Sequence, residues 1–375
     1  MTINNEHKKL NVPNLRFPEF QGEWEKRTLG DASEFSKERV NTQNLSSDNY
    51  VATENMLQDY QGIIEASSVP TNTKVIKFNK GDVLLSNIRP YLKKVWFADK
   101  NGGCSADVFV FKALSACIPD FLHYIIANDR FINFAMSGAK GVKMPRGDKE
   151  QMKTYEIGLP SIEEQKKMAK LLSFLDERIA TQNKIIDKLQ SLIKGISNRI
   201  FTSIQGIEYR MGDIVTITNG NSNVQDAVTQ SKDGLYPFFD RSEDIKYLPT
   251  FLFDKEAIIY PGEGTEFMPR YFKGKFALHQ RCYAIFDFNE IINARFLYFY
   301  LKTRNSYFVK NAVGSTVPSL RLDTFQKLKV IIPPKEIQHS VSLCLSSMEL
   351  KCNIEKKILH KLLKQKQYLL RQMFI

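Results

Sequence analysis

The chain has 375 residues, of which 43% are hydrophobic and 25% are charged, and its 53 Lys and Arg against 41 Asp and Glu give a formal net charge of +12. This composition is ordinary for globular domains, and the length is enough for two or three of them, so disorder is expected at most at the ends of the chain. No apolar run approaches the roughly 18 residues of a membrane span, and the polar start Met1–Leu10 lacks the apolar core of a signal peptide, which predicts a cytoplasmic protein. The positive surplus favours a polyanionic partner, with nucleic acid as the first candidate.

Residues 1–158 are predicted to form a first globular domain. It begins with a lead of about twenty residues, in which Val12-Pro13 and Phe17-Pro18 favour extended chain. β-branched and aromatic runs separated by a turn at Asn79-Lys80-Gly81 indicate strands, and an aromatic-rich run after a proline indicates a short helix. The expected strands are 74–78, 82–85 and 108–111, and the expected helix is 119–128.

Residues 159–204 are predicted to form a first long helix. Pro160-Ser161 bar helix before them and acidic residues follow, so the helix is expected to begin just after the proline. Its apolar residues then alternate spacings of four and three, and a mean period of 3.5 keeps such a stripe facing one partner helix. The alternative is a pair of long amphipathic helices that pack on globular cores. The predicted coiled-coil seam is Leu172, Leu175, Ile179, Gln182, Ile186 and Leu189.

Residues 205–331 repeat the first domain and residues 332–375 repeat the long helix. Strands are expected at 257–260 and 283–286, a short helix at 292–303, and the second long helix directly after Pro333-Pro334. Its seam is weaker than the first because polar residues interrupt it. The predicted seam is Leu345, Met348, Cys352, Glu355, Leu359 and Leu362.

The two halves carry the signature of an internal duplication with a constant offset of 173 residues. The landmarks are Gly141 and Gly314, Pro145 and Pro318, Gln165 and Gln338, and Phe201 and Phe374. We therefore predict an α+β protein in which two α/β domains, related by a pseudo-two-fold axis, are separated by two long antiparallel coiled-coil helices.

The same axis sets the register of the helices. An axis through the midpoints of antiparallel helices brings each central residue beside its own copy, and the centre of the first helix is Gln182, whose copy is Glu355. A polar residue in a seam costs stability but fixes register, because slippage leaves its hydrogen-bonding groups facing apolar neighbours. We expect the two side chains to lie within one hydrogen bond or a bridging water. The competing interpretation is that the seam turns to solvent there.

The sequence contains no catalytic signature. Neither a P-loop, a G-x-G-x-x-G after a strand, nor H-E-x-x-H is present, and no Asn- or Asp-Pro-Pro-aromatic tetrapeptide of an amino-methyltransferase is found. A nuclease cluster built from distant carboxylates and lysines stays open. The five cysteines lack zinc-ligand spacing and are expected to be buried thiols, and His279 with Cys282 is far more often core or loop than a metal site. We expect no catalytic residue, no metal and no cofactor in this chain.

Basic residues alternate with aromatic residues in two stretches, Asn87–Phe97 and Met268–Arg281, and a basic loop follows at Gly138–Lys149. Arginine and lysine neutralise phosphates or reach guanine edges, and aromatic rings pack on sugars and bases. The alternative for each residue is a solvated charged strand face. The candidate DNA-binding residues are Arg89, Tyr91, Lys93, Lys94, Lys140, Lys143, Arg146, Arg270, Tyr271, Lys273, Lys275 and Arg281.

The whole chain resembles the specificity subunit of Type I restriction–modification systems. The duplicated helix entry, a proline followed five residues later by glutamine, is its most specific feature. The stretches that carry the resemblance are Leu15-Arg16-Phe17-Pro18-Glu19-Phe20 with Trp24 and Leu29-Gly30-Asp31, Gly81-Asp82-Val83-Leu84-Leu85-Ser86-Asn87-Ile88-Arg89-Pro90, Leu159-Pro160 with Gln165, Ile332-Pro333 with Gln338, and Gln372-Met373-Phe374.

The resemblance implies a non-catalytic DNA-reading subunit. Its two globular domains would be target recognition domains, each reading half of a bipartite, asymmetric site in double-stranded DNA, and its helices would be spacers that set the distance between the half-sites and dock two modification subunits. S-adenosylmethionine would bind to those methyltransferase partners, and ATP and Mg would belong to restriction subunits that translocate and cleave DNA. The alternatives are a self-contained DNA methyltransferase or nuclease and a coiled-coil scaffold that binds only protein.

Overall fold

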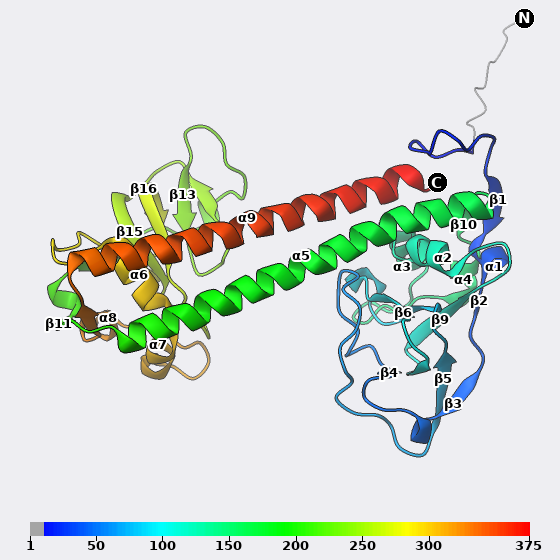
Figure 1. Cartoon of the computed structure of the whole chain (residues 1–375), viewed down its shortest axis with the longest axis horizontal. Coiled ribbons are helices and arrows are strands. Elements are labelled where there is room, and N and C mark those ends of the chain that lie inside the picture. The colour runs from blue at the N-terminus through cyan, green and yellow to red at the C-terminus, as the bar shows by residue number, and fades with distance from the viewer. Residues whose placement is uncertain (1–10) are drawn as a thin grey trace, which may run out of the picture. The chain divides into compact units, whose positions relative to one another are not determined.

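The computed structural model describes residues 11–375, and Figure 1 traces the chain through it. The chain divides into two compact units: unit 1 runs to Thr181 and also includes Leu359–Ile375, and unit 2 is Gln182–Ile358. Each unit therefore holds one globular half of the sequence with parts of two long helices, α5 (Ile162–Ser203) and α9 (Lys335–Met373). The boundaries predicted from the sequence follow the helix ends, whereas the compact units divide both helices near their middles.

The globular part of unit 1 is built on two four-stranded sheets, with strand orders β2-β9-β6-β7 and β3-β5-β8-β4. Alternate residues of β6 pack on opposite sides: Val83 and Leu85 contact the core beneath the short helices, and Leu84 joins a second core with Phe78. Both faces of β6 are therefore buried. The strands are β2 (Ser33–Phe35), β3 (Arg39–Asn41), β4 (Tyr50–Val51), β5 (Lys74–Phe78), β6 (Val83–Ser86), β7 (Val95–Phe97), β8 (Gly102–Cys104) and β9 (Val108–Ala113), and the helices are α1 (Leu29–Ala32), α2 (Pro119–Ile126), α3 (Asp129–Ser137) and α4 (Lys149–Lys153).

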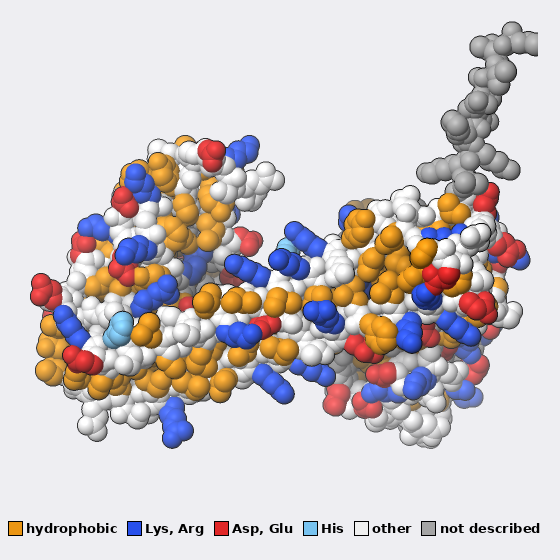
Figure 2. Space-filling model, turned by 45° about the horizontal axis from the view of Figure 1, so that its top comes forward, with side chains coloured by type: hydrophobic (Ala, Val, Ile, Leu, Met, Phe, Trp, Pro, Cys, Tyr) orange, Lys and Arg blue, Asp and Glu red, His pale blue; other side chains and the backbone are white. Residues whose placement is uncertain are grey.

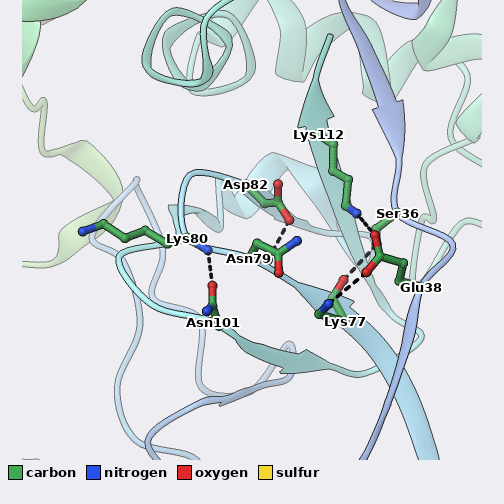
Figure 3. A network of polar contacts seen from close by, with 8 residues as sticks. All are labelled: Ser36, Glu38, Lys77, Asn79, Lys80, Asp82, Asn101 and Lys112. Carbon is green, nitrogen blue, oxygen red and sulfur yellow. Dashed lines mark hydrogen bonds and ion pairs between the residues drawn. The ribbon is translucent and has the colours of Figure 1, made fainter.

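A polar network joins the two sheets of unit 1 (Figure 3). The hydroxyl of Ser36 donates to the carbonyl of Lys77 at 2.8 Å, and the carboxylate of Glu38 accepts from the ammonium groups of Lys77, at 3.0 Å, and of Lys112. The hydrogen bond from Lys112, followed by that from Lys77, lowers the pKa of Glu38 to about 2. Because Lys77 belongs to β5 and Lys112 to β9, this ionised carboxylate pairs with one lysine from each sheet.

Unit 2 carries one six-stranded sheet instead, in the order β12-β17-β15-β16-β13-β14. Its central strand β15 repeats the pattern of β6, because Ile258 and Tyr260 face the core with helix α6 while Ala257 and Ile259 face a second core. The strands are β12 (Thr216–Asn219), β13 (Tyr236–Phe239), β14 (Lys246–Leu248), β15 (Phe253–Pro261), β16 (Arg270–Leu278) and β17 (Cys282–Phe286), and the helices are α6 (Ala294–Lys302), α7 (Asn305–Asn311) and α8 (Leu322–Gln326).

The duplicated glutamine anchors each long helix to its globular part. Gln165 is fully buried, and its Nε2 donates to the carbonyls of Ala116 at 2.9 Å and Pro160 at 3.0 Å. Its Oε1 accepts the backbone N–H of Ile118 at 2.9 Å, directly before α2 begins. One side chain thus ties the entry of α5 to the entry of α2.

Gln338 makes the same three bonds in unit 2. Its Nε2 donates to the carbonyls of Ile291 and Pro333, both at 2.9 Å, and its Oε1 accepts the N–H of Asn293 at 2.8 Å. A two-stranded antiparallel sheet also precedes each long helix: β1 (Glu25–Thr28) pairs with β10 (Glu156–Leu159), and β11 (Ile207–Arg210) pairs with β18 (Lys329–Ile332). The duplication inferred from the sequence is therefore present in the structure of both units.

The two long helices pair antiparallel, because the partner number falls as α5 proceeds. Asp176 contacts Lys366 within unit 1 at 2.5 Å, and Gln182 contacts Glu355 within unit 2. The helices begin directly after Pro160-Ser161 and Pro333-Pro334, which confirms the predicted starts. The predicted seam residues are all withdrawn from solvent. The buried ones are Leu172, Leu175, Gln182, Ile186, Leu345, Cys352, Glu355 and Leu362, and the half-buried ones are Ile179, Leu189, Met348 and Leu359.

The polar pair in the seam confirms the predicted register. The Nε2 of Gln182 donates to the carboxylate of Glu355 at 2.5 Å and to its backbone carbonyl at 3.2 Å. Glu355 also accepts from Lys351, one turn earlier on its own helix, at 2.5 Å. The hydrogen bond from Lys351, followed by that from Gln182, lowers the pKa of Glu355, so the carboxylate stays ionised although it is buried.

The cysteines are buried as expected, with one exception: Cys344 is exposed. That expectation was wrong because Cys344 directly precedes the seam residue Leu345, and the heptad phase turns it away from α5. Among residues 11–375, no helix has the length and apolar character that crossing a membrane requires.

Candidate nucleic-acid interface

Two loops of unit 1 carry seven of the predicted DNA-binding residues, and backbone bonds hold these loops together. The first loop joins β6 to β7, and the second lies between α3 and α4. The N–H of Arg89 donates to the carbonyl of Pro145 at 2.8 Å, and Ile88 forms an isolated β-bridge with Arg146. The first loop carries Arg89, Tyr91, Lys93 and Lys94, and the second carries Lys140, Lys143 and Arg146.

The second loop is a small hairpin with a defined shape. Lys140 and Arg146 exchange both backbone hydrogen bonds at 2.9 Å, which closes the chain between them into a five-residue turn. Gly141 has φ of 95°, a conformation that other residues rarely adopt, and Pro145 is buried beneath the turn. The three residues between them, Val142-Lys143-Met144, are exposed. The glycine and the proline therefore shape a rigid frame around a solvent-facing tip.

Several of the predicted cations in unit 1 already have acidic partners. Lys93 pairs with Asp129 at 2.8 Å, Lys140 with Asp148 at 2.7 Å, and Arg146 with Asp107 at 3.2 Å. Side chains as exposed as Lys140 (83%) and Arg146 (55%) gain about 1 kcal/mol or less from such pairs. A phosphate group can therefore replace either carboxylate at small cost.

Two other basic residues of the first loop, Lys94 and Arg89, pair with no carboxylate of residues 11–375 but contact the fold in other ways. Lys94 donates to the carbonyl of Thr53 at 2.7 Å, which makes it part of the scaffold. Arg89 has a left-handed backbone with φ of 52°, and its Nε is buried without a hydrogen-bond partner among the described residues. A non-glycine residue in this conformation is uncommon because the backbone is strained, and it persists only where the surrounding structure holds it in place.

In unit 2 the predicted residues lie on β16 and on the turn that follows it. The guanidinium of Arg270 lies over the ring of Phe239, and it donates to two backbone carbonyls, of Ser242 at 2.8 Å and of Asp240. Burial lowers the pKa of Arg270. Arg270 therefore stabilises the fold of unit 2. The sequence pattern of alternating basic and aromatic residues is the same for this role as for DNA binding, so it does not separate the two.

The other candidates of unit 2 are engaged to different degrees. The hydroxyl of Tyr271 donates to the carboxylate of Glu256, and its ring centroid lies 3.7 Å from Cζ of Arg295. Burial, followed by the hydrogen bond to Glu256, raises the pKa of Tyr271 to about 12. Arg281 pairs with Glu263 at 2.8 Å. The exposed residues of the set are Lys273, Lys275 and Arg281.

A loop of unit 2 that the charge pattern does not single out has the same frame as the hairpin of unit 1. Val313 and Ser319 exchange backbone bonds at 2.9 and 2.8 Å, and Gly314 has φ of 104°. This hairpin is also held against the loop that follows β15, because the N–H of Gly264 donates to the carbonyl of Pro318 at 3.0 Å. The signal that finds the loop is the offset of 173 residues, because its sequence carries no charge between Val313 and Ser319.

No group of three or more His, Cys, Asp or Glu side chains suited to a metal ion occurs within residues 11–375. The Nδ1 of His279 accepts the backbone N–H of Arg281 at 3.2 Å, and Cys282 is buried in the second core of unit 2. His279 and Cys282 therefore contact their own fold, as a turn residue and a core residue.

Comparison with known proteins identifies a family. The sequence matches the family described as the Type I restriction modification DNA specificity domain twice, over residues 21–191 and 207–364. It is 30% identical to the EcoDI specificity subunit of Escherichia coli over 123 residues, which are 33% of this chain and 26% of that protein. It is also 30% identical to the MjaVIII specificity subunit of Methanocaldococcus jannaschii over 194 residues, 50% of this chain and 43% of the relative. The matches thus span less than half the length of these curated relatives.

Solved structures share the fold. The S subunit of a Type I restriction-modification system from M. genitalium matches 97% of this chain and 99% of its own, with a TM-score of 0.67 and 18% identity. A chain from a study of complex assembly and conformational transition in a type I R-M system matches 92% of this chain and 96% of its own, with a TM-score of 0.53 and 17% identity. With two matched regions that together cover most of the sequence, this chain belongs to the family of Type I restriction modification DNA specificity domains, of which it carries two copies.

Proposed function

We propose that the chain is the DNA sequence-recognition subunit of a Type I restriction–modification complex and has no catalytic centre of its own. The observation that carries this proposal is that one chain holds two copies of a specificity domain, each with the same loop frame and a different exposed tip. A fixed frame with a variable tip suits sequence reading, because phosphate contacts position a protein while base contacts specify the site.

Each unit reads one half of a bipartite site in double-stranded DNA. The tips differ in charge, since Val142-Lys143-Met144 carries a lysine and Ser315-Thr316-Val317 is uncharged. Two different readers select two different half-sites, so the complete target is asymmetric. This arrangement is the single-chain equivalent of a dimer that reads two half-sites.

The long helices set the number of unspecified bases between the half-sites and dock two modification subunits. Apolar side chains outside the seam support docking, because a helix face that remains apolar and uncovered is typical of a protein interface. Figure 2 shows hydrophobic side chains along the long helices with lysine and arginine side chains beside them. Within unit 2 the exposed apolar residues of α5 and α9 are Ile185, Leu192, Ile337, Leu343, Leu350 and Ile354.

The chemistry belongs to the partners of this chain. The modification subunits bind S-adenosylmethionine and methylate adenine, and the restriction subunits use ATP and Mg to translocate and cleave DNA. This chain supplies the positioning of both activities on one DNA sequence.

The test is to co-express the chain with its modification subunit and to map methylated adenines by long-read sequencing. The expected result is one two-part motif with a constant number of unspecified bases between its halves. The purified chain alone should transfer no tritium from S-adenosylmethionine to DNA. Methyl transfer by the chain alone, or methylation at a continuous motif, would overturn the proposal.

A further inference from the structure

The tip of the loop hairpin is exposed in each unit. In unit 1, Val142 is fully exposed and Met144 is 48% exposed, although both are apolar. In unit 2, Val317 is 44% exposed in the corresponding place. Apolar side chains that are exposed at the end of a turn add little to the core, which leaves them available for contact with a partner.

The frame beneath the tip is the same in both units, although most of the residues around it differ. Gly141 and Gly314 both have positive φ, and a Cβ on either would approach a carbonyl, that of Met144 at 3.3 Å or that of Val317 at 3.0 Å. One bridging residue pair closes each turn, and a backbone bond joins it to the loop that follows β6 in unit 1 or β15 in unit 2. The two copies thus share the backbone geometry of the turn and differ in the three exposed residues at its tip.

We propose that Val142-Lys143-Met144 and Ser315-Thr316-Val317 are the base-reading tips of the two units, each entering the major groove of its own half-site. This inference rests on the proposed function and names the residues through which it acts. Each tip is a tight turn closed by one residue pair that exchanges both backbone hydrogen bonds, Lys140 with Arg146 and Val313 with Ser319. The two backbone segments of such a pair lie about 4.8 Å apart, and with its side chains the turn fits the major groove, which is about 12 Å wide, and exceeds the minor groove at about 6 Å.

The chemistry of the two tips predicts different contacts. Val142 and Met144 offer methyl groups that pack on the C5-methyl of thymine, and Lys143 offers a cation for guanine O6 and N7. Ser315 and Thr316 offer hydroxyl groups, which donate and accept, beside the methyl groups of Thr316 and Val317.

Charge complementarity supports DNA as the occupant at the first tip. Lys140 and Arg146 form the residue pair that closes the turn, on either side of Lys143 in the sequence, and both are exposed. Their carboxylate partners, Asp148 and Asp107, are at the surface as well, so phosphates of the two DNA strands can take their place. The second hairpin has Val313 and Ser319 at the matching positions, which carry no charge.

The test exchanges the two tips within the chain. One variant carries Val142→Ser, Lys143→Thr and Met144→Val, which writes the second tip on the first frame; the reciprocal variant carries Ser315→Val, Thr316→Lys and Val317→Met. Each is co-expressed with the modification subunit, and methylated motifs are mapped. The first variant should change one half of the motif, the reciprocal variant should change the other half, and the spacing should remain. Lys80→Thr removes the same charge from an exposed turn of unit 1 and serves as the control that leaves the motif unchanged.

Unchanged motifs in both exchange variants would overturn the inference, as would a change in both halves from one exchange. If the exchange variants do not fold, Lys143→Ala and Met144→Ala shorten exposed side chains, and each should weaken binding of the complex to its specific duplex, Lys143→Ala by roughly 5- to 150-fold. Affinity within about twofold of the original for both would overturn it equally. Failure of the proposed function is a separate result, because the unaltered complex would then leave no two-part motif.

Discussion

Gln165 shows how much of the unit depends on one duplicated residue. Replacing it with alanine leaves the N–H of Ile118 and the carbonyls of Ala116 and Pro160 without their partner in a buried position. Buried unsatisfied groups cost about 1–3 kcal/mol each, with less where water enters, so Gln165→Ala should lower the free energy of unfolding of unit 1 by about 2–4 kcal/mol. Chemical denaturation measures it.

The matched control is Gln190→Ala, which changes an exposed glutamine on the same helix and should move the free energy of unfolding by less than about 0.5 kcal/mol. Equal losses from the two variants would show that Gln165 contributes only helix propensity.

His123 makes the stability of unit 1 sensitive to acid. Its ring stacks on Phe97 with centroids 5.2 Å apart, and its Nδ1 is buried without a hydrogen-bond partner among the described residues, while the rest of the ring keeps partial exposure. Burial, with a smaller effect of Lys366, lowers the pKa of His123 from 6.5 to about 3. Below pH 6.5 the unfolded chain therefore takes up a proton that the folded chain does not, and stability falls as the pH drops from about 6.5 toward 3.

His123→Phe keeps the aromatic stack and removes this titration. Between pH 7.5 and pH 5, the original protein should lose on the order of 1 kcal/mol more of its free energy of unfolding than the variant, a loss reduced by the partial exposure of the ring. Denaturation curves at both pH values measure the difference. Parallel losses in the two proteins would contradict the prediction.

Charge selects candidate residues from a sequence but does not assign their role. Arg270 and Lys94 match the basic pattern as well as Lys143 does, yet both donate to backbone carbonyls of their own unit. Those partners, Ser242 and Thr53, lie far from them in the chain, and no local spacing predicts such contacts. Gln182 and Glu355 could be predicted because a duplication gives the symmetry that pairs them.

Among the elements, the seam of α5 and α9 allows a direct measurement of its polar pair. Gln182→Leu leaves the buried Glu355 with Lys351 alone and should cost about 1–2 kcal/mol. Replacing both Gln182 and Glu355 with leucine restores an apolar seam and should be neutral or stabilising. A double-mutant cycle should therefore give a coupling of about 1–3 kcal/mol.

The control cycle combines Glu355→Leu with a leucine at Gln190, which is exposed on α5 and lies outside the seam. These two effects should add within about 0.5 kcal/mol. A coupling as small as this for Gln182 and Glu355 would mean that their hydrogen bond contributes nothing to the folded state.

Helices were predictable from this sequence to a degree that sheets were not. Proline, acidic residues and a heptad repeat define the start and the face of α5 locally, so the sequence determines both. Strand order depends on pairing between distant segments, and the two units differ in it: unit 1 has two four-stranded sheets where unit 2 has one of six strands. The strands β6 and β15 keep the same two-sided burial in both. Local patterns therefore give the strands, and the loops that vary between the halves decide their neighbours.

For the whole molecule, the proposed function makes the length of the paired helices the quantity that sets the number of unspecified bases between the half-sites. Seven residues added within Ala180–Lys194, with seven matching residues in the paired part of α9, keep the heptad phase and extend the helices by about 10 Å. That length corresponds to roughly three base-pair steps of 3.4 Å, so the methylated motif should gain about three unspecified bases while both half-sites stay the same. Mapping of methylated sites reads this directly.

Insertions of two residues at the same places are the control, because they break the heptad phase and should lower the melting temperature without giving a new motif. A variant with the seven-residue insertions that folds, and whose complex methylates DNA at the original spacing, would refute the proposal that the helices set the spacing.

The last residues of α9 give the protein an order of assembly. Leu370, Met373 and Phe374 belong to the main core of unit 1, where Phe374 stacks on Phe121 and its carbonyl accepts from Arg130 at 2.9 Å. On the ribosome, unit 1 emerges first, but these residues follow only after all of Gln182–Ile358 has been made, which takes roughly 10–35 s at 5–20 residues per second. During that interval the nascent unit 1 has an open apolar face. A chain that stops before Leu370 therefore lacks part of the main core of unit 1, although every residue of the hairpin at 140–146 is present.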